Sequence, residues 1–220
     1  MGPMVPVLVL ALAAAAPGEA GRVVERVVAV VRIPNAPPRP ITLTELTEEA
    51  RIALVGHGAV AAAFQPLDRE ALRAALDGLV DQMLVVADEA ARRRAGQMER
   101  EALLAEMRRF RGQFPSQAEY ARFLEASEIT EEDLAVVLER GLRVRRYLES
   151  RVGPWSRVSE EEVDRYLAER GADRTSEAAR DAVRTRLVQQ KVTAQVKQLL
   201  ADLRARAEIR LLPGEGEEGG

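Results

Sequence analysis

The C-terminal segment "AEIRLL" (Ala207–Leu212) constrains the fold more than any other part of this sequence. It follows a long helical stretch and has the composition of a β-strand. A strand needs a partner for its backbone amide and carbonyl groups. The other strand-like sequences lie near the opposite end of the chain, at Val24–Val31 and Ile41–Leu43. We therefore expect the two ends of the chain to meet in a small β-sheet.

The sequence between these strands is predicted to be helical almost throughout. Charged residues make up 30% of the chain and aromatic residues only 4%, a composition that favours helices. Polar residues that cap helices, in "SQAE" (Ser116–Glu119), "TEED" (Thr130–Asp133) and "SEEE" (Ser159–Glu162), mark three starts. The predicted fold class is thus mainly α, with the small sheet at the chain ends. The expected helices cover approximately residues 45–55, 68–94, 98–111, 116–127, 130–152, 159–169 and 176–206.

The N-terminus resembles a secretory signal. The apolar run Val5–Ala16 is too short to span a bilayer core of about 30 Å as a helix. Pro17 follows it, and Gly18 and Ala20 place small residues at the −3 and −1 positions of a signal-peptidase site. We predict that residues 1–20 are a signal peptide, cleaved after Ala20. No Lys or Arg precedes the apolar run, so a buried N-terminal helix is the alternative.

Several classes of chemistry find no support in the residues. The chain has no cysteine, which excludes disulfides, thiolate nucleophiles and cysteine-ligated metals. The single histidine, His57, lies between two glycines and is interpreted as a loop residue near a helix end. The acidic clusters Glu131–Asp133 and Glu160–Glu162 occupy first helical turns, where capping explains them. A net charge of −3 with interleaved signs does not favour nucleic acid. We expect no catalytic or metal site, no cofactor and no nucleic-acid partner.

The order of the segments resembles a known family. The signal peptide, then "VVERVVAVV" and "PITLTEL", then "LVDQMLVV" (Leu79–Val86), "RVSEEEVDRYLAER" and "AEIRLL" are similar to the chaperone module of SurA-type periplasmic proteins and of related parvulin-type isomerases. The proline-rich segment Arg32–Arg39 replaces a tight turn of that family. The resemblance implies a helical chaperone domain at residues 21–212, in which residues 175–212 fold back onto the rest. Residues 213–220 would form a disordered acidic tail.

The same resemblance indicates that a catalytic domain is missing. In this family the isomerase domain is inserted between the helix that matches "RVSEEEVDRYLAER" and the final helix. Here only Gly171–Arg174 separates the two predicted helices, whereas a parvulin domain needs on the order of 90 residues. The family's active site also uses histidines, and His57 lies in a different part of the chain. We therefore expect no isomerase activity and no enzymatic function.

The resemblance implies an ATP-independent holdase in the periplasm, with no membrane anchor after signal cleavage, that binds unfolded secreted or outer-membrane proteins. An envelope assembly protein with one dedicated partner is the alternative, and a homodimer that covers an open apolar cleft is compatible with either. Flexible apolar side chains suit such binding. Ordinary core packing is the competing interpretation for the candidate client-binding residues, and Trp155 is expected to pack at a helix junction. The candidates are Met98, Met107, Phe110, Phe114, Tyr120 and Phe123.

Overall fold

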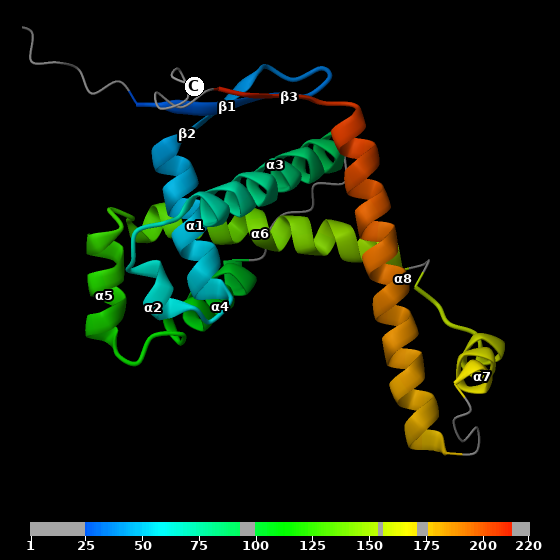
Figure 1. Cartoon of the computed structure of the whole chain (residues 1–220). Helices are drawn as coiled ribbons and strands as arrows, with labels where there is room; N and C mark the ends of the chain where they lie inside the picture. Colours follow the sequence, from blue (N-terminus) through cyan, green and yellow to red (C-terminus); the bar gives the residue numbers. More distant parts are fainter. Residues whose placement is uncertain (1–24, 93–99, 154–155, 171–175, 213–220) are drawn as a thin grey trace, which may run out of the picture.

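The computed structural model describes residues 25–92, 100–153, 156–170 and 176–212. Within these ranges the chain is mainly helical, with one small antiparallel sheet built from both ends of the chain (Figure 1). The predicted fold class is therefore confirmed. The predicted signal peptide and acidic tail lie outside the described residues.

The sheet has three strands in the order β2-β1-β3, with β1 (Val27–Arg32) at its centre. The strand β2 (Arg39–Thr42) pairs with one side of β1, and β3 (Glu208–Leu211) with the other, both antiparallel. β2 begins inside the proline-rich segment, where the sequence predicted a loop. Pro40 lacks an N–H group, but it lies on an edge strand, where a missing donor is tolerated.

Two hydrophobic cores hold the helices together. The first core lies under the sheet and is formed with α3 (Arg69–Ala91), α6 (Glu131–Val152) and α8 (Glu177–Ala205). The second core joins α1 (Leu43–Gly56), α2 (Val60–Ala63), α4 (Arg100–Arg111), α5 (Gln117–Ala126) and the start of α6. The long helices α3 and α6 pack against each other and carry the sheet on one side and the smaller helices on the other (Figure 1).

The C-terminal helix α8 projects beyond this body (Figure 1). Its 29 residues correspond to about 43 Å at the rise of an α-helix. Only its C-terminal part contacts α3 and α6, and the short helix α7 (Glu160–Glu169) packs beside its N-terminal half. We call α7 and the N-terminal half of α8 the arm. Val163 and Leu167 of α7 are buried there although they belong to neither core.

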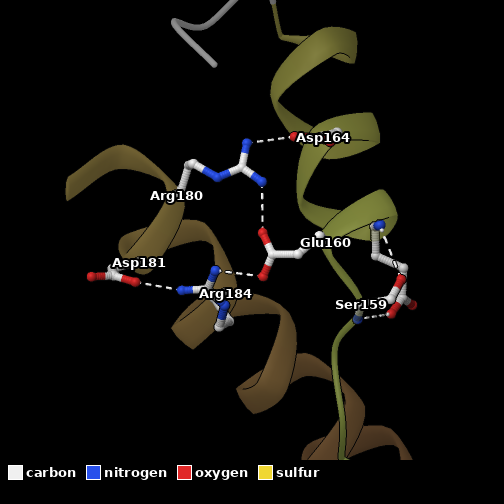
Figure 2. Close-up of polar contacts among 7 residues, drawn as sticks. Ser159, Glu160, Asp164, Arg180, Asp181 and Arg184 are labelled. Atoms are coloured by element: carbon white, nitrogen blue, oxygen red, sulfur yellow. Dashed lines mark hydrogen bonds and ion pairs between the residues drawn. The ribbon is translucent and has the colours of Figure 1, made fainter. Parts of the chain in front are cut away.

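Ion pairs between charged side chains join α7 to α8 in the arm (Figure 2). Arg180 pairs with Glu160 and Asp164, and Arg184 also reaches Glu160 at 2.6 Å. Ser159 caps α7 in a capping box, in which Glu162 donates its N–H to the Ser159 side chain and accepts from the Ser159 N–H, as "SEEE" predicted. The carboxylates of Glu160 and Asp164 in these pairs are exposed to solvent, which weakens the attraction, so the pairs orient α7 more than they stabilise it.

The starts of α3, α5, α6, α7 and α8 were predicted correctly, whereas α1 begins at Leu43 instead of near residue 45 and α2 was not predicted. The N-cap of α1 is Thr42, whose side chain accepts from the Glu45 N–H. Asp68, Ser116, Thr130 and Ser159 each accept a hydrogen bond from the backbone of the first helical turn. The sequence placed the end of α1 before Gly56, whereas the helix includes Gly56 and is capped by His57. The residue with left-handed backbone is Gly58, whose N–H donates to Val55, while the Ala59 N–H donates to Leu54. This pattern is a Schellman motif, and in "GHG" the second glycine supplies its left-handed residue.

Candidate functional site

An apolar groove runs between the β1–β2 loop and the C-terminal half of α3. It consists of two adjoining hollows of about 560 and 470 Å³ that share Ile33, Ala36, Ala87 and Ala90. We call it the hairpin groove. Its wall is residues 33–40, which comprise the β1–β2 loop and the first two residues of β2, its floor is α3, and one end is closed by the C-terminal part of α8. The remaining lining residues are Val31, Pro34, Asn35, Pro37, Pro38, Arg39, Pro40, Met83, Leu84, Val86, Asp88, Ala91, Arg140, Leu203 and Arg206.

The wall of the groove is stiff because of its local chemistry. The Ala36 N–H donates to the Ile33 carbonyl oxygen at 3.1 Å, which closes a turn with Pro34 and Asn35 at its centre. Asn35 has φ of 63°, in the left-handed region that asparagine tolerates better than most residues. Pro37 and Pro38 follow and are exposed. The loop therefore presents fixed apolar rings with few backbone donors to the groove.

The floor of the groove is hollow because α3 carries small side chains there. Ala87 and Ala90 lie one turn apart on the same side of α3, and both line the two hollows. Val86 and Ala87 are half-buried and Ala90 is exposed, although Leu84 and Val85 beside them are buried in the first core. The helix thus uses one side for the core and leaves a second apolar side open toward the loop.

A buried carboxylate closes the end of the groove near α8. Asp88 accepts hydrogen bonds from the Tyr147 hydroxyl and from Arg92 Nε at 2.9 Å, and its other oxygen lies 3.8 Å from Arg206 Nη2. Burial acts to raise the pKa of Asp88, but the hydrogen bonds from Arg92 and Tyr147 outweigh it, so this pKa lies below its usual value. Burial, together with Asp88, raises the pKa of Tyr147. Asp88 is therefore held ionised and joins α3 and α6 to the end of α8.

Arginines line the opposite end of the groove. Arg39 of β2 pairs with Glu45, and Arg140 of α6 pairs with the buried Glu49 and donates from Nε to Gln82 at 2.9 Å. Burial lowers the pKa of Arg140, which is still a strong base and stays charged. The groove thus has an apolar centre and ionic ends whose charges are already paired, an arrangement that suits apolar side chains of another molecule better than a reacting group.

The aromatic residues predicted to face a client lie inside the protein. Phe110, Phe114, Tyr120 and Phe123 are at most 7% exposed, and they pack in the second core with ring centroids 5.3 to 6.0 Å apart. The structure thus agrees with the core interpretation for these four. They are not presented on a surface, because α4 and α5 turn their aromatic sides toward each other and toward α1. Met107 is half-buried against the same core.

The remaining residues named in the sequence analysis are Met98, Trp155, His57 and the cluster Glu131–Asp133. Met98 and Trp155 lie outside the described residues. His57 is the exposed C-cap residue of α1, as expected for a loop histidine at a helix end. In the cluster Glu131–Asp133, Asp133 completes a capping box with Thr130, as capping predicted.

Apart from the hairpin groove, a more polar hollow of about 300 Å³ lies between α1, α4 and α6. Its carboxylates are engaged with arginines: Glu106 pairs with Arg109 and Arg145, and Glu49 pairs with Arg140. Across residues 25–92, 100–153, 156–170 and 176–212, no group of three or more His, Cys, Asp or Glu side chains is arranged to hold a metal ion. None of the helices in those ranges is long and apolar enough to cross a bilayer.

The sequence carries only a weak signal for the hairpin groove. The segment "PNAPPRP" departs from a tight turn, but its prolines indicate only a loop. The alanines of "ADEAA" (Ala87–Ala91) fit any helix. These alanines line a groove only because the β1–β2 loop lies over this part of α3, and the sequence does not show how the loop and the helix are placed.

No model of a known protein family matches this chain, and a search of curated proteins gives no significant match.

Proposed function

We propose that this protein is an ATP-independent periplasmic chaperone, a holdase that binds unfolded secreted or outer-membrane proteins and has no isomerase activity. The hairpin groove is the observation that carries this proposal. It is an open apolar surface with paired charges at both ends, built on a rigid helical body. Such a surface accepts apolar side chains of many sequences without requiring a particular hydrogen-bonding pattern.

The size of the groove supports weak and reversible binding. Burying one aliphatic or aromatic side chain contributes about 1.5–3 kcal/mol. After the cost of association, two or three such side chains give an affinity in the micromolar range or weaker. A client held this loosely leaves without an energy source, as a chaperone working outside the cytoplasm requires.

The short link between α7 and α8 supports the absence of an isomerase domain. The helix α7 ends at Glu169 and α8 begins at Glu177, so few residues separate the two helices. A domain of about 90 residues does not fit there. In a proline-isomerisation assay on a short peptide, we expect the uncatalysed rate.

The test is light scattering of a denatured outer-membrane β-barrel protein, diluted into buffer with and without the chain from residue 21 onward. We expect suppression of aggregation at near-stoichiometric amounts, repeated with an unrelated client. Ala90→Glu places a charge in the groove, and we expect it to reduce suppression several-fold. Ala74→Glu is the matched control, because Ala74 is also an exposed alanine of α3 but does not line the groove.

Three outcomes would contradict parts of the proposal. If the wild-type chain suppresses no aggregation at several-fold excess, the holdase function is wrong. Protection of one client alone would favour the dedicated envelope partner. If Ala90→Glu and Ala74→Glu both act like the wild type, clients bind somewhere other than the hairpin groove.

A further inference from the structure

The strand β3 has an open outer edge. It lies at the end of the sheet, and no strand in the described part of the chain pairs with its outer side. The Leu212 N–H donates to the Val28 carbonyl oxygen at 2.9 Å, and Arg210 lies opposite Val30. Because backbone groups alternate along an antiparallel strand, Arg210 and Leu212 point toward β1, whereas Ile209 and Leu211 direct their N–H and C=O groups outward.

The side chains of β3 divide by face. Ile209 and Leu211 lie opposite Val31 and Ala29 of β1, on the face of the core, and Glu208 and Arg210 lie on the other face. Leu211 is nevertheless 59% exposed, because little covers the end of the strand. Every residue of β3 is exposed or half-buried, so another chain has access to this edge.

We propose that a second copy of this chain binds the free edge of β3, strand to strand and antiparallel, about a two-fold axis at Ile209. The two three-stranded sheets would then form one continuous sheet of six strands. Ile209 would exchange backbone hydrogen bonds with the partner's Ile209. Glu208 would lie opposite the partner's Arg210, and Arg210 opposite the partner's Glu208. Such a pairing is isologous and closed, and it ends at the dimer.

The alternation of charge selects this partner and this register. Moving the axis to Arg210 keeps outward backbone groups paired but places Arg210 opposite the partner's Arg210, and like charges in that position are unfavourable. Moving it to Leu211 places Arg210 opposite an apolar residue and removes Glu208 from the pairing. The axis at Ile209 gives two opposite-charge pairs on one face and apolar residues, Ile209 and Leu211 with Ala207, on the other. A strand without this alternation of charge leaves Glu208 and Arg210 opposite uncharged or like-charged residues, and a short charged edge disfavours such a partner.

The test is sedimentation velocity of the chain from residue 21 over a range of concentrations, with variants that reverse one charge at a time. We expect a reversible dimer for the wild type. Arg210→Glu and Glu208→Arg each convert two attractive pairs into two repulsive ones, and each should weaken association by about 10-fold or more. Arg165→Glu, at an exposed residue of α7, is the control for the charge change alone and should leave the dimer intact.

Mixing the two variants gives the sharpest result. Arg210→Glu carries two acidic residues in β3 and Glu208→Arg carries two basic ones, so each is complementary to the other. We expect the mixture to restore the dimer as a heterodimer. Ile209→Pro removes an outward N–H that β1 does not use, and should also abolish the dimer while far-UV circular dichroism stays unchanged.

The proposal is wrong if the wild type stays monomeric at the highest concentration tested, or if the mixed variants stay as monomeric as each variant alone. A dimer that survives Ile209→Pro would place the interface elsewhere. These measurements involve no client, so they are independent of the aggregation assay.

Discussion

Removing the Tyr147 hydroxyl is expected to destabilise the junction of α3, α6 and the end of α8. In Tyr147→Phe the ring stays in the first core, so no cavity forms, but the buried Asp88 carboxylate loses one of its two hydrogen-bond donors. Hydrogen bonds to charged groups contribute about 1.5–3 kcal/mol each. Because Arg92 still donates to Asp88, we expect a loss near the low end, about 1.5 kcal/mol of unfolding free energy.

Asp88→Asn removes the negative charge of this side chain but leaves an amide oxygen that can still accept a hydrogen bond, so it measures the contribution of the charge. The side chain keeps its shape but loses its charge-assisted contacts with Arg92 and Arg206, so we expect a loss of about 1–2 kcal/mol. The double variant with Tyr147→Phe should lose less than the sum of the two single variants, since both remove the same interaction. Urea unfolding at neutral pH, followed by far-UV circular dichroism, measures all three values.

The pH dependence provides a second check on the same network. The folded pKa of Asp88 is lowered, so its ionised form stabilises the fold above the usual aspartate pKa of about 3.9. That contribution is lost as the pH falls through the folded pKa. The difference between wild type and Asp88→Asn should therefore be constant near neutrality and shrink below about pH 4. A Tyr147→Phe variant within about 0.5 kcal/mol of wild type would refute the role assigned to this hydrogen bond.

Two further variants test local features of the fold. Glu128 follows α5 with φ of 55°, and the Ile129 N–H donates to Leu124 in a Schellman motif that normally takes glycine, so Glu128→Gly should raise the unfolding free energy by about 1 kcal/mol in the same urea assay. Leu167 is 2% exposed on α7, and Leu167→Ala should weaken docking of the arm by about 2–3 kcal/mol, seen as faster hydrogen exchange in α7. Raising the salt concentration should have a smaller effect on that exchange, because the acidic partners of Arg180 are exposed to solvent and such pairs contribute little; an equal effect would contradict this order.

Most helix starts could be predicted from the sequence because they depend on interactions between residues close together in the chain. Capping residues such as Thr130 and Ser159 satisfy backbone donors within one turn, so they mark helix starts without reference to the rest of the molecule. That the two chain ends meet in one sheet could be predicted because a strand cannot stay unpaired, but the partner of β3, which is β1, is known only from the structure. The end of α1 was misplaced because "GHG" offers two glycines and only the backbone decides which becomes left-handed.

The candidate site was harder to predict because it depends on which side of each helix is covered. Periodicity places Phe110 and Phe123 on apolar sides of α4 and α5, but the same spacing fits a core and a binding surface equally well. The structure decides for the core, since α1 and α6 complete the enclosure. In contrast, Ala87 and Ala90 look unremarkable in the sequence, and only the loop above them turns that side of α3 into a groove.

Closure of the sheet by β3 also completes the hairpin groove. The wall comes from residues 33–40 near the start of the described chain, and the closed end comes from Leu203 and Arg206, just before β3. Pairing of β3 with β1 fixes the end of α8 beside Asp88, where Arg206 approaches the carboxylate. The hollow of about 470 Å³ therefore needs both segments in place, whereas the hollow of about 560 Å³ has no lining residue from α8 or β3.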